Sequence, residues 1–185
     1  MLNTLTPPTR YWQPGELIVI GIFSAMIKLS SLLIALTGGG MNPLSLVLKN
    51  LVATSLLVVL VFKVRKFGVL TLFVTVSTLI SMLLDGGNII RLPGALIAGG
   101  LCDLVIHFSG GYQKPGALIA GVAVFDLLSR FIALGLSWLT MREQPAMVMV
   151  ASVIVALGYL GCLMGLFSGL HLSRELTHAG VLRHE

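Results

Sequence analysis

Six apolar runs, separated by short polar or glycine-rich segments, make up most of this chain. They are close to the roughly 20 residues that a helix needs to cross the hydrocarbon layer of a bilayer. Turn-forming residues divide them, among them the glycines at 38–40 and the Asp85–Asn88 segment. The pattern predicts an all-α integral membrane protein built as a bundle of six transmembrane helices. The expected spans are residues 16–37, 44–62, 68–84, 93–108, 115–140 and 146–170.

Small residues in the first and last spans predict close contacts between helices. Lipid gives apolar helices no hydrophobic reason to associate, so close backbone approach must supply the packing energy. In the last span Gly161, Gly165 and Gly169 recur at intervals of four, and the partner helix could belong to this chain or to another. In the first span one helical face carries small and polar residues. This face consists of Gly21, Ser24, Ala25, Lys28, Ser31 and Ala35.

Composition supports the membrane assignment. The 185 residues are 56% hydrophobic and 10% charged, with a mean hydropathy of +1.00, too few charges to cover a soluble domain of this length. The net charge of +5 does not indicate nucleic acid, because the basic residues are not gathered into one stripe. We therefore expect the lipid bilayer as the partner and no nucleic acid. Cys102 and Cys162 lie within apolar spans without CxxC spacing, and we expect them to be packing residues.

The distribution of basic residues predicts the orientation. Six spans place both termini on one side, and an excess of Lys and Arg marks the cytoplasmic side. Of the 12 basic residues, the opposite loops hold only Arg91 and Arg142. We therefore expect an N-in, C-in topology, with a cytoplasmic tail at 1–15, the helical domain at 16–170 and a second cytoplasmic tail at 171–185. The basic residues on the terminal side are Arg10, Lys63, Arg65, Lys66, Lys114, Arg174 and Arg183.

Four ionisable residues within the spans form a candidate intramembrane charge network. Lys28, Asp103 and Asp126 each lie roughly 16–18 Å from one end of their helix, near the midplane. Lys28 could pair with either acid, or contact substrate. Arg130 follows Asp126 by four residues, which favours an ion pair between them. Buried charges of this kind need either a partner or a function.

Lys49 is expected to lie about 9 Å below the outer boundary. It could extend its ammonium group to the outer surface, or it could face a cavity beneath the 38–42 turn and attract an anion. A carboxylate or a phosphate would suit Lys49 together with Arg130. Asp85, Arg91 and Arg142 would surround the same outer opening. The expected substrate-binding residues are Lys49, Asn42, Arg130, Asn88 and Trp138.

Motifs of several enzyme classes are absent from the sequence. It has no GxxxxGK[ST] phosphate loop, no HExxH and no GxSxG, so ATP hydrolysis would have to come from another subunit. The four histidines fall at or beyond the predicted cytoplasmic ends, so no metal site is expected on the outer face. We expect no catalytic residues and no cofactor. An intramembrane enzyme would gain support only if Asp103 and His107 shared a water-filled pocket.

The arrangement resembles the substrate-binding S components of energy-coupling factor (ECF) transporters, which belong to the ABC transporters. Three stretches resemble the Trep_Strep/MptD-like group of that family more narrowly. Within the second, Asp103 takes the place of the group's acid, and Tyr112 and Lys114 follow. The stretches are ELIVIGIFSAMIK, LCDLVIHFSGGYQKP and GLFSGLHLSRELTHAGVL.

The resemblance implies a role in the uptake of a micronutrient across the bacterial inner membrane. The chain would capture a vitamin-like or tetrapyrrole-like solute, and a transmembrane coupling (T) subunit with two ABC ATPases would drive its delivery. The resemblance implies that Gly21, Ala25 and Ala35 contact the coupling subunit. The cobalt and nickel branch begins with Met-His, whereas this chain begins with Met1 and Leu2, so metal is not expected. The alternative is a structural subunit that assembles a membrane complex and binds no solute. Only the capture subunit demands a closed, ligand-sized cavity, which we expect at the outer ends of helices four to six.

Overall fold

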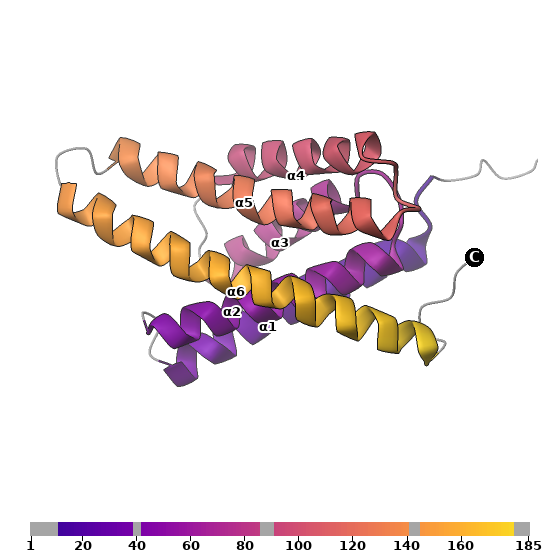
Figure 1. Ribbon diagram of the computed structural model, residues 1–185, viewed down its shortest axis with the longest axis horizontal. Helices are drawn as coiled ribbons and strands as arrows, with labels where there is room; N and C mark the ends of the chain where they lie inside the picture. The colour runs from indigo at the N-terminus through magenta and orange to yellow at the C-terminus, as the bar shows by residue number, and fades with distance from the viewer. Residues whose placement is uncertain (1–10, 39–41, 86–90, 141–144, 180–185) are drawn as a thin grey trace, which may run out of the picture.

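The computed structural model describes residues 11–38, 42–85, 91–140 and 145–179. Within these ranges the chain is entirely helices and their connections, which confirms the predicted all-α class (Figure 1). Successive helices run in opposite directions, so α1 begins and the last helix ends at the same end of the bundle. The helices are α1 (Pro14–Gly38), α2 (Pro43–Lys63), α3 (Val69–Asp85), α4 (Arg91–Phe108), α5 (Pro115–Thr140) and α6 (Pro145–His178).

Four of these helices, α1, α2, α5 and α6, are long and apolar enough to cross a bilayer. The other two are shorter, with 17 residues in α3 and 18 in α4. At 1.5 Å per residue they are about 26–27 Å long, a little under the ~30 Å of a typical hydrocarbon core. All six predicted spans are therefore helices, and a complete crossing by α3 and α4 stays a prediction.

Helix α6 continues beyond the predicted end of its span. Its 34 residues reach His178, so the first part of the segment expected as a tail from residue 171 is helical. The apolar run ends near Leu170, but the next residues include neither glycine nor proline, so nothing in them stops a helix. The sequence pattern located the end of the apolar surface, and the backbone hydrogen bonds continue for about two further turns.

The starts of two helices follow from local sequence. Pro43 and Pro115 each occupy the first helical position, where a missing N–H costs nothing and the fixed φ favours the helix. Asn42 caps α2, and its side chain accepts a hydrogen bond from the Leu44 N–H at 3.4 Å. Between α2 and α3 the chain turns at Gly68, whose φ of +91° is a conformation that side chains with a Cβ rarely adopt.

Helix α2 contacts α1, α5 and α6, and α6 packs along it with backbones in close approach. A Cβ added at Gly161 would lie 2.5 Å from the Val47 carbonyl oxygen, and one at Gly165 would lie 2.7 Å from the Leu51 carbonyl oxygen. The Ser55 hydroxyl also donates across the interface to the Gly165 carbonyl at 3.1 Å. The small-residue pattern of the last span is therefore used within this chain.

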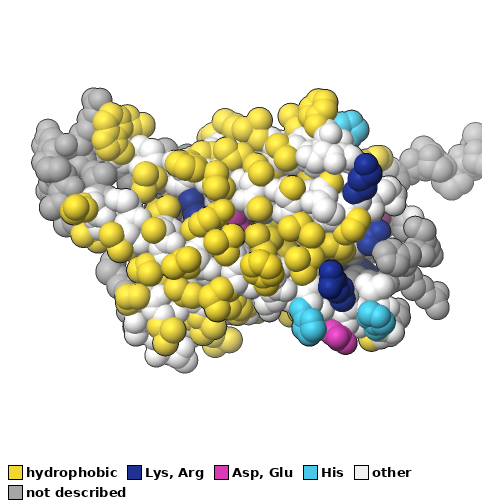
Figure 2. Space-filling view, viewed as in Figure 1, with side chains coloured by type: hydrophobic (Ala, Val, Ile, Leu, Met, Phe, Trp, Pro, Cys, Tyr) yellow, Lys and Arg dark blue, Asp and Glu magenta, His cyan; other side chains and the backbone are white. Residues whose placement is uncertain are grey.

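The buried apolar core lies toward one end of the bundle. Leu60 and Val61 near the end of α2, Leu70 at the start of α3 and Ile106 near the end of α4 are completely shielded from solvent. We call this the basic end, because Lys and Arg side chains gather there on the visible face (Figure 2). The described basic residues of its connections and helix ends are Lys63, Arg65, Lys66, Lys114 and Arg174.

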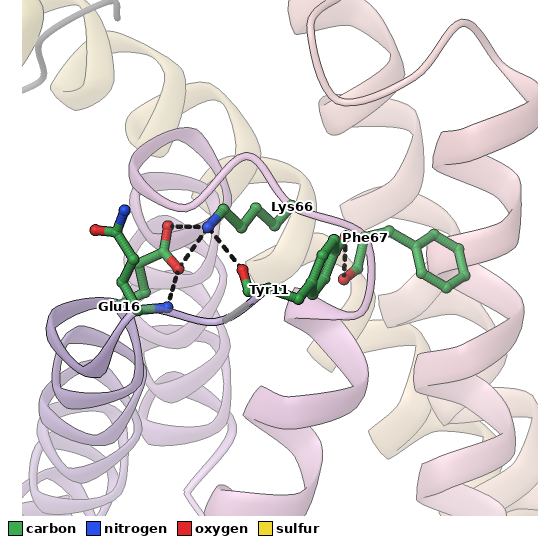
Figure 3. A network of polar contacts seen from close by, with 5 residues as sticks. Tyr11, Glu16, Lys66 and Phe67 are labelled. Atoms are coloured by element: carbon green, nitrogen blue, oxygen red, sulfur yellow. Dashed lines mark hydrogen bonds and ion pairs between the residues drawn. The ribbon is translucent and has the colours of Figure 1, made fainter. Parts of the chain in front are cut away.

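A polar network joins the start of α1 to the α2–α3 connection at this end (Figure 3). The Lys66 ammonium forms an ion pair with Glu16 at 2.8 Å and donates to the Tyr11 carbonyl at 2.9 Å. Glu16 also accepts from the Gln13 N–H at 2.9 Å, and the Tyr11 hydroxyl donates to the Phe67 carbonyl at 3.4 Å. A partly exposed pair contributes under about 1 kcal/mol, so the network mainly fixes how the chain enters α1.

Candidate functional site

A cavity of about 160 Å³ lies between α1, α2 and α3, toward the end opposite the basic end. Its walls come from the second half of α1, the first turns of α2 and the last turn of α3. The bundle therefore has a packed apolar core at one end and a cavity at the other. The residues that line the cavity are Lys28, Ser31, Leu32, Ala35, Lys49 and Leu84.

Helical spacing explains how the walls form. Lys28, Ser31 and Ala35 stand at positions i, i+3 and i+7, so α1 presents them on one face. On α2, the early start at Pro43 places Lys49 less than two turns into the helix. The Ser45 hydroxyl donates to the Gly38 carbonyl at 3.3 Å, which ties the end of α1 to the start of α2. The two lysines are thus held on adjacent helices around one space.

The described walls of the cavity carry basic side chains and no acidic one. Lys28 and Lys49 contribute two ammonium groups and Ser31 one hydroxyl, while the remaining described wall residues are apolar. Ionisable side chains at membrane depth are costly, and those that occur mark functional sites or bury their charge against partners. An anionic group of a ligand is the chemistry that two lysines and a hydroxyl would bind.

A second polar cluster joins α5 to α2 and α6 outside this cavity. The Arg130 guanidinium donates to the Asn50 side-chain oxygen at 2.6 Å and to the Cys162 sulfur at 3.0 Å. One turn earlier, Asp126 accepts from the Thr54 hydroxyl at 2.8 Å. No ion pair joins Asp126 to Arg130 in the part of the chain that the structure describes. The two charged residues instead attach α5 to successive turns of α2.

A glycine on α6 makes room for this cluster. A Cβ at Gly158 would overlap the Arg130 guanidinium and come within 3.1 Å of the Asn50 side-chain nitrogen. Both cysteines are buried and free. Cys162 was expected only to pack against its neighbours, but its sulfur also accepts a hydrogen bond from Arg130. The Arg130 Nε, by contrast, is buried without a hydrogen-bond partner.

Asp103 lies in a third place, near the basic end. Its carboxylate accepts hydrogen bonds from the backbone N–H groups of Leu70 and Thr71, at 3.3 and 3.0 Å. The Thr71 and Tyr112 hydroxyls donate to it at 2.7 and 2.6 Å. The first N–H groups of a helix have no partner within the helix, and the helix dipole favours negative charge there. Asp103 of α4 is therefore the N-terminal cap of α3.

One comparison with known proteins, the one against family models, identifies a membrane-protein family. A family model described as a hypothetical bacterial integral membrane protein, Trep_Strep, matches residues 15–152, well over half of the chain. The chain belongs to the Trep_Strep family. It is therefore a bacterial integral membrane protein. Neither the curated proteins nor the solved structures include a match to it.

The structure of this Trep_Strep protein distributes the predicted substrate-binding residues over several places. Lys49 lines the cavity, whereas Arg130 belongs to the α2–α5–α6 cluster. Asn42 caps α2 and is exposed, and Trp138 is 47% exposed on α5. Asn88 lies outside the described residues. The residues expected around one opening are thus not brought together as a single set.

The predicted charge network is likewise divided among three places. Lys28 lines the cavity, Asp103 caps α3, and Asp126 and Arg130 bond to α2. Asp103 and His107 do not share a water-filled pocket: Asp103 is 1% exposed with four donors bonded to it, and the exposed His107 ring stacks edge-on against Phe67. This pair does not form the acid–base site that an intramembrane enzyme would need.

The residues expected to contact a coupling subunit also differ in their surroundings. A Cβ added at Gly21 would meet nothing within 4 Å, so the α1 surface is open there. Ala25, one turn further along α1, is only partly buried. Ala35 instead lines the cavity with Lys28 and Lys49. The small-residue face of α1 thus forms part of an open surface in the first half of the helix and lines the cavity in the second half.

The sequence held a signal for this cavity. Lys28, Ser31 and Ala35 are readily placed on one face of α1, and Lys49 was predicted to face a cavity as one alternative. The pattern did not show that the two lysines belong to the same space. The contribution of Leu84 at the end of α3 had no sequence signal, because only the packing of α3 beside α1 brings it there.

Tyr112, in the connection before α5, provides a test at high pH. Burial, and then its hydrogen bond to Asp103, raise the pKa of the Tyr112 phenol above its ordinary value. An unfolded tyrosine loses its proton near pH 10, whereas Tyr112 keeps it in the folded protein. Its stabilising contribution is therefore complete below about pH 10 and is lost as the pH rises toward the raised folded pKa.

We expect Tyr112→Phe to lower the free energy of unfolding by about 1–2 kcal/mol at pH 8. The difference in the free energy of unfolding between this variant and the parent protein should be smaller at pH 11. Chemical unfolding in mixed micelles at the two pH values measures it. Tyr159→Phe is the control, because it removes a phenol that does not bond Asp103. A Tyr112→Phe effect that is the same at both pH values would contradict the assignment.

Proposed function

We propose that this chain is the substrate-capture (S) subunit of an ECF importer in the bacterial cytoplasmic membrane. All six helices cross the membrane in this proposal, with both termini in the cytoplasm. The chain takes up a vitamin-like or tetrapyrrole-like micronutrient, and a coupling subunit with two ATPases supplies the energy. The observation that carries the proposal is the cavity lined by Lys28 and Lys49 opposite the basic end. A purely structural subunit has no need of such a cavity.

The asymmetry of the bundle supports the orientation. Lys63, Arg65, Lys66, Lys114 and Arg174 are at or near the helix ends of the basic end, which the excess of positive charge assigns to the cytoplasm. The cavity then faces outward, where a capture subunit must receive its solute. The expectation from sequence placed a ligand cavity at the outer ends of helices four to six. The described cavity lies instead among α1, α2 and α3.

The surface of α1 supports a place for the coupling subunit. The α6 glycines already pack against α2 within the chain, so they are not offered to another protein. Gly21, in contrast, has open space in front of it, and Ile18 and Ile22 beside it are 60% and 53% exposed. A neighbouring helix can approach closely at such a glycine.

We expect Gly21→Leu to reduce recovery of the coupling subunit and ATPases about tenfold, because the larger side chain blocks close helix approach. The open space at Gly21 means that the chain itself should remain folded. The experiment is purification of the tagged chain from its native membrane, with mass spectrometry of the recovered proteins and small molecules. Gly135→Leu is the matched control, because Gly135 of α5 is equally open.

The two hypotheses give different outcomes. Recovery of a coupling subunit and ATPases with the parent chain and Gly135→Leu, but not with Gly21→Leu, supports the importer. Recovery of other membrane proteins, with no ATPase and no solute, supports the structural subunit and contradicts the proposal.

A further inference from the structure

The cavity extends well below the ends of the helices that line it. Lys28 precedes the end of α1 by ten residues, and Lys49 follows the start of α2 by six. At 1.5 Å per residue these positions lie about 15 Å and 9 Å from the helix ends. Both lysines are only partly exposed. Electrostatic attraction to a bound anion is stronger there than at a fully hydrated surface, because the effective dielectric constant is lower.

The described walls supply donors for an anion and no acidic side chain. Each lysine ammonium carries three N–H donors, so a bond to the protein still leaves donors for a ligand. Ser31 adds a hydroxyl between them in sequence, on the same face of α1 as Lys28. Two ammonium groups and a hydroxyl around one space suit a group with two negative charges or several acceptor oxygens, such as a phosphate or paired carboxylates.

Two buried hydroxyls lie on the same helix faces, further into the bundle. Ser24 precedes Lys28 by one turn of α1, and Ser77 precedes Leu84 by two turns of α3. Both hydroxyl oxygens are buried without a hydrogen-bond partner. Buried polar groups are nearly always bonded, so these two hydroxyls offer further hydrogen-bonding capacity on the helix faces that line the cavity. This observation is independent of the lysines.

The size of the cavity limits what it can hold. Its volume of about 160 Å³ is below the roughly 300–1,000 Å³ of pockets that enclose a complete drug-sized ligand. A tetrapyrrole or a whole vitamin does not fit within the described walls. One anionic group does fit, and the rest of a larger solute would have to project outward.

We propose that Lys28, Ser31 and Lys49 form a subsite for a phosphate or dicarboxylate group. The identity of that group as part of a transported solute rests on the proposed function. The anion site itself does not, because it is a property of this chain alone and is tested without partner subunits.

The test measures binding of inorganic phosphate to the purified full chain in neutral detergent. Phosphate replaces chloride at constant ionic strength, and thermal unfolding is followed, since a ligand that binds only the folded state raises the transition temperature. Succinate provides the dicarboxylate arm. We expect saturable stabilisation of the parent protein by at least one of the two anions. Lys49→Gln and Lys28→Gln should each weaken binding about tenfold or more.

Two further variants separate binding from folding. Lys49→Arg keeps the charge and should restore much of the binding. Lys63→Gln removes a lysine from the other end of the same helix, away from the cavity, and should bind as the parent protein does. Equal stabilisation of the parent protein and both cavity variants overturns the proposal. So does the absence of stabilisation by either anion, when no bound phospholipid depends on Lys49 either.

A lipid headgroup carries the same phosphate chemistry, and a second arm distinguishes it. Native mass spectrometry of the chain, before and after addition of phosphatidylglycerol, detects a bound phospholipid. Lipid retained by the parent protein and lost from Lys49→Gln supports the anion site with a lipid as its occupant. Binding that depends on Lys49, in a chain that recovers no ATPase, keeps the anion site and refutes the importer. Recovery of the importer subunits, in a chain that binds no anion, keeps the proposed importer function and refutes the anion site.

Discussion

Replacing Gly165 with alanine is expected to destabilise the protein by about 3 kcal/mol, near the upper end for overpacking a tight interface. The added Cβ would lie 2.7 Å from the Leu51 carbonyl oxygen and 2.9 Å from the Thr54 Cβ. The first contact is to backbone, so α2 and α6 must move apart to relieve it. That movement would also break the 3.1 Å hydrogen bond from the Ser55 hydroxyl to the Gly165 carbonyl.

The measurement is the free energy of unfolding in mixed micelles, followed by circular dichroism. Gly100→Ala is the matched control, because a Cβ there meets nothing within 4 Å and alanine has the higher intrinsic helix propensity. It should be neutral or slightly stabilising. Equal stability of the two variants would mean that α6 does not pack against α2 through its glycine face.

Asp103→Asn is expected to cost about 2–4 kcal/mol. The carboxylate accepts four hydrogen bonds, two of them from the first N–H groups of α3. An asparagine replaces one acceptor oxygen with an NH₂ group, which would face donors of Leu70, Thr71 or Tyr112. The substitution also removes the negative charge from the positive end of the α3 dipole. The start of α3 should therefore lose its cap.

Asp126→Asn provides the comparison, because an asparagine oxygen can keep the bond that Asp126 accepts from the Thr54 hydroxyl. Thermal unfolding of both variants in detergent, with backbone hydrogen exchange at the start of α3, gives the readout. We expect Asp103→Asn alone to increase exchange at Leu70 and Thr71. A cost for Asp103→Asn no greater than that for Asp126→Asn would refute its capping role.

The charged residues within the spans show where sequence reasoning ends. Their existence and the cost of burying them were evident from the chain, and so was the helical spacing of Asp126 and Arg130. Their partners were not evident, because Thr54 and Asn50 lie more than 70 residues away in sequence. In the described part of the chain, Asp126 and Arg130 bond to these neutral residues, and not to each other, because α2 packs beside α5.

The glycines of α6 show a similar division. Their interval of four was sufficient to predict a close helix contact. It was not sufficient to choose the partner, since any helix with an accessible backbone satisfies the same pattern. The tertiary structure places α2 against them, with Val47, Leu51 and Ser55 also four residues apart. Gly21 on α1, by contrast, keeps open space in front of it, and it carries the prediction about partner subunits.

The sequence by itself determined the class of this protein and the approximate bounds of its helices. Length, hydropathy and the turn residues are local properties, and a bilayer demands long apolar helices whatever their arrangement. The packing of the helices decided the rest: the cap of α3 by Asp103, the burial of the α6 glycines and the meeting of Lys28 with Lys49 around one cavity. Each of these joins residues from different helices, and lipid-facing apolar surface does not specify which helices meet.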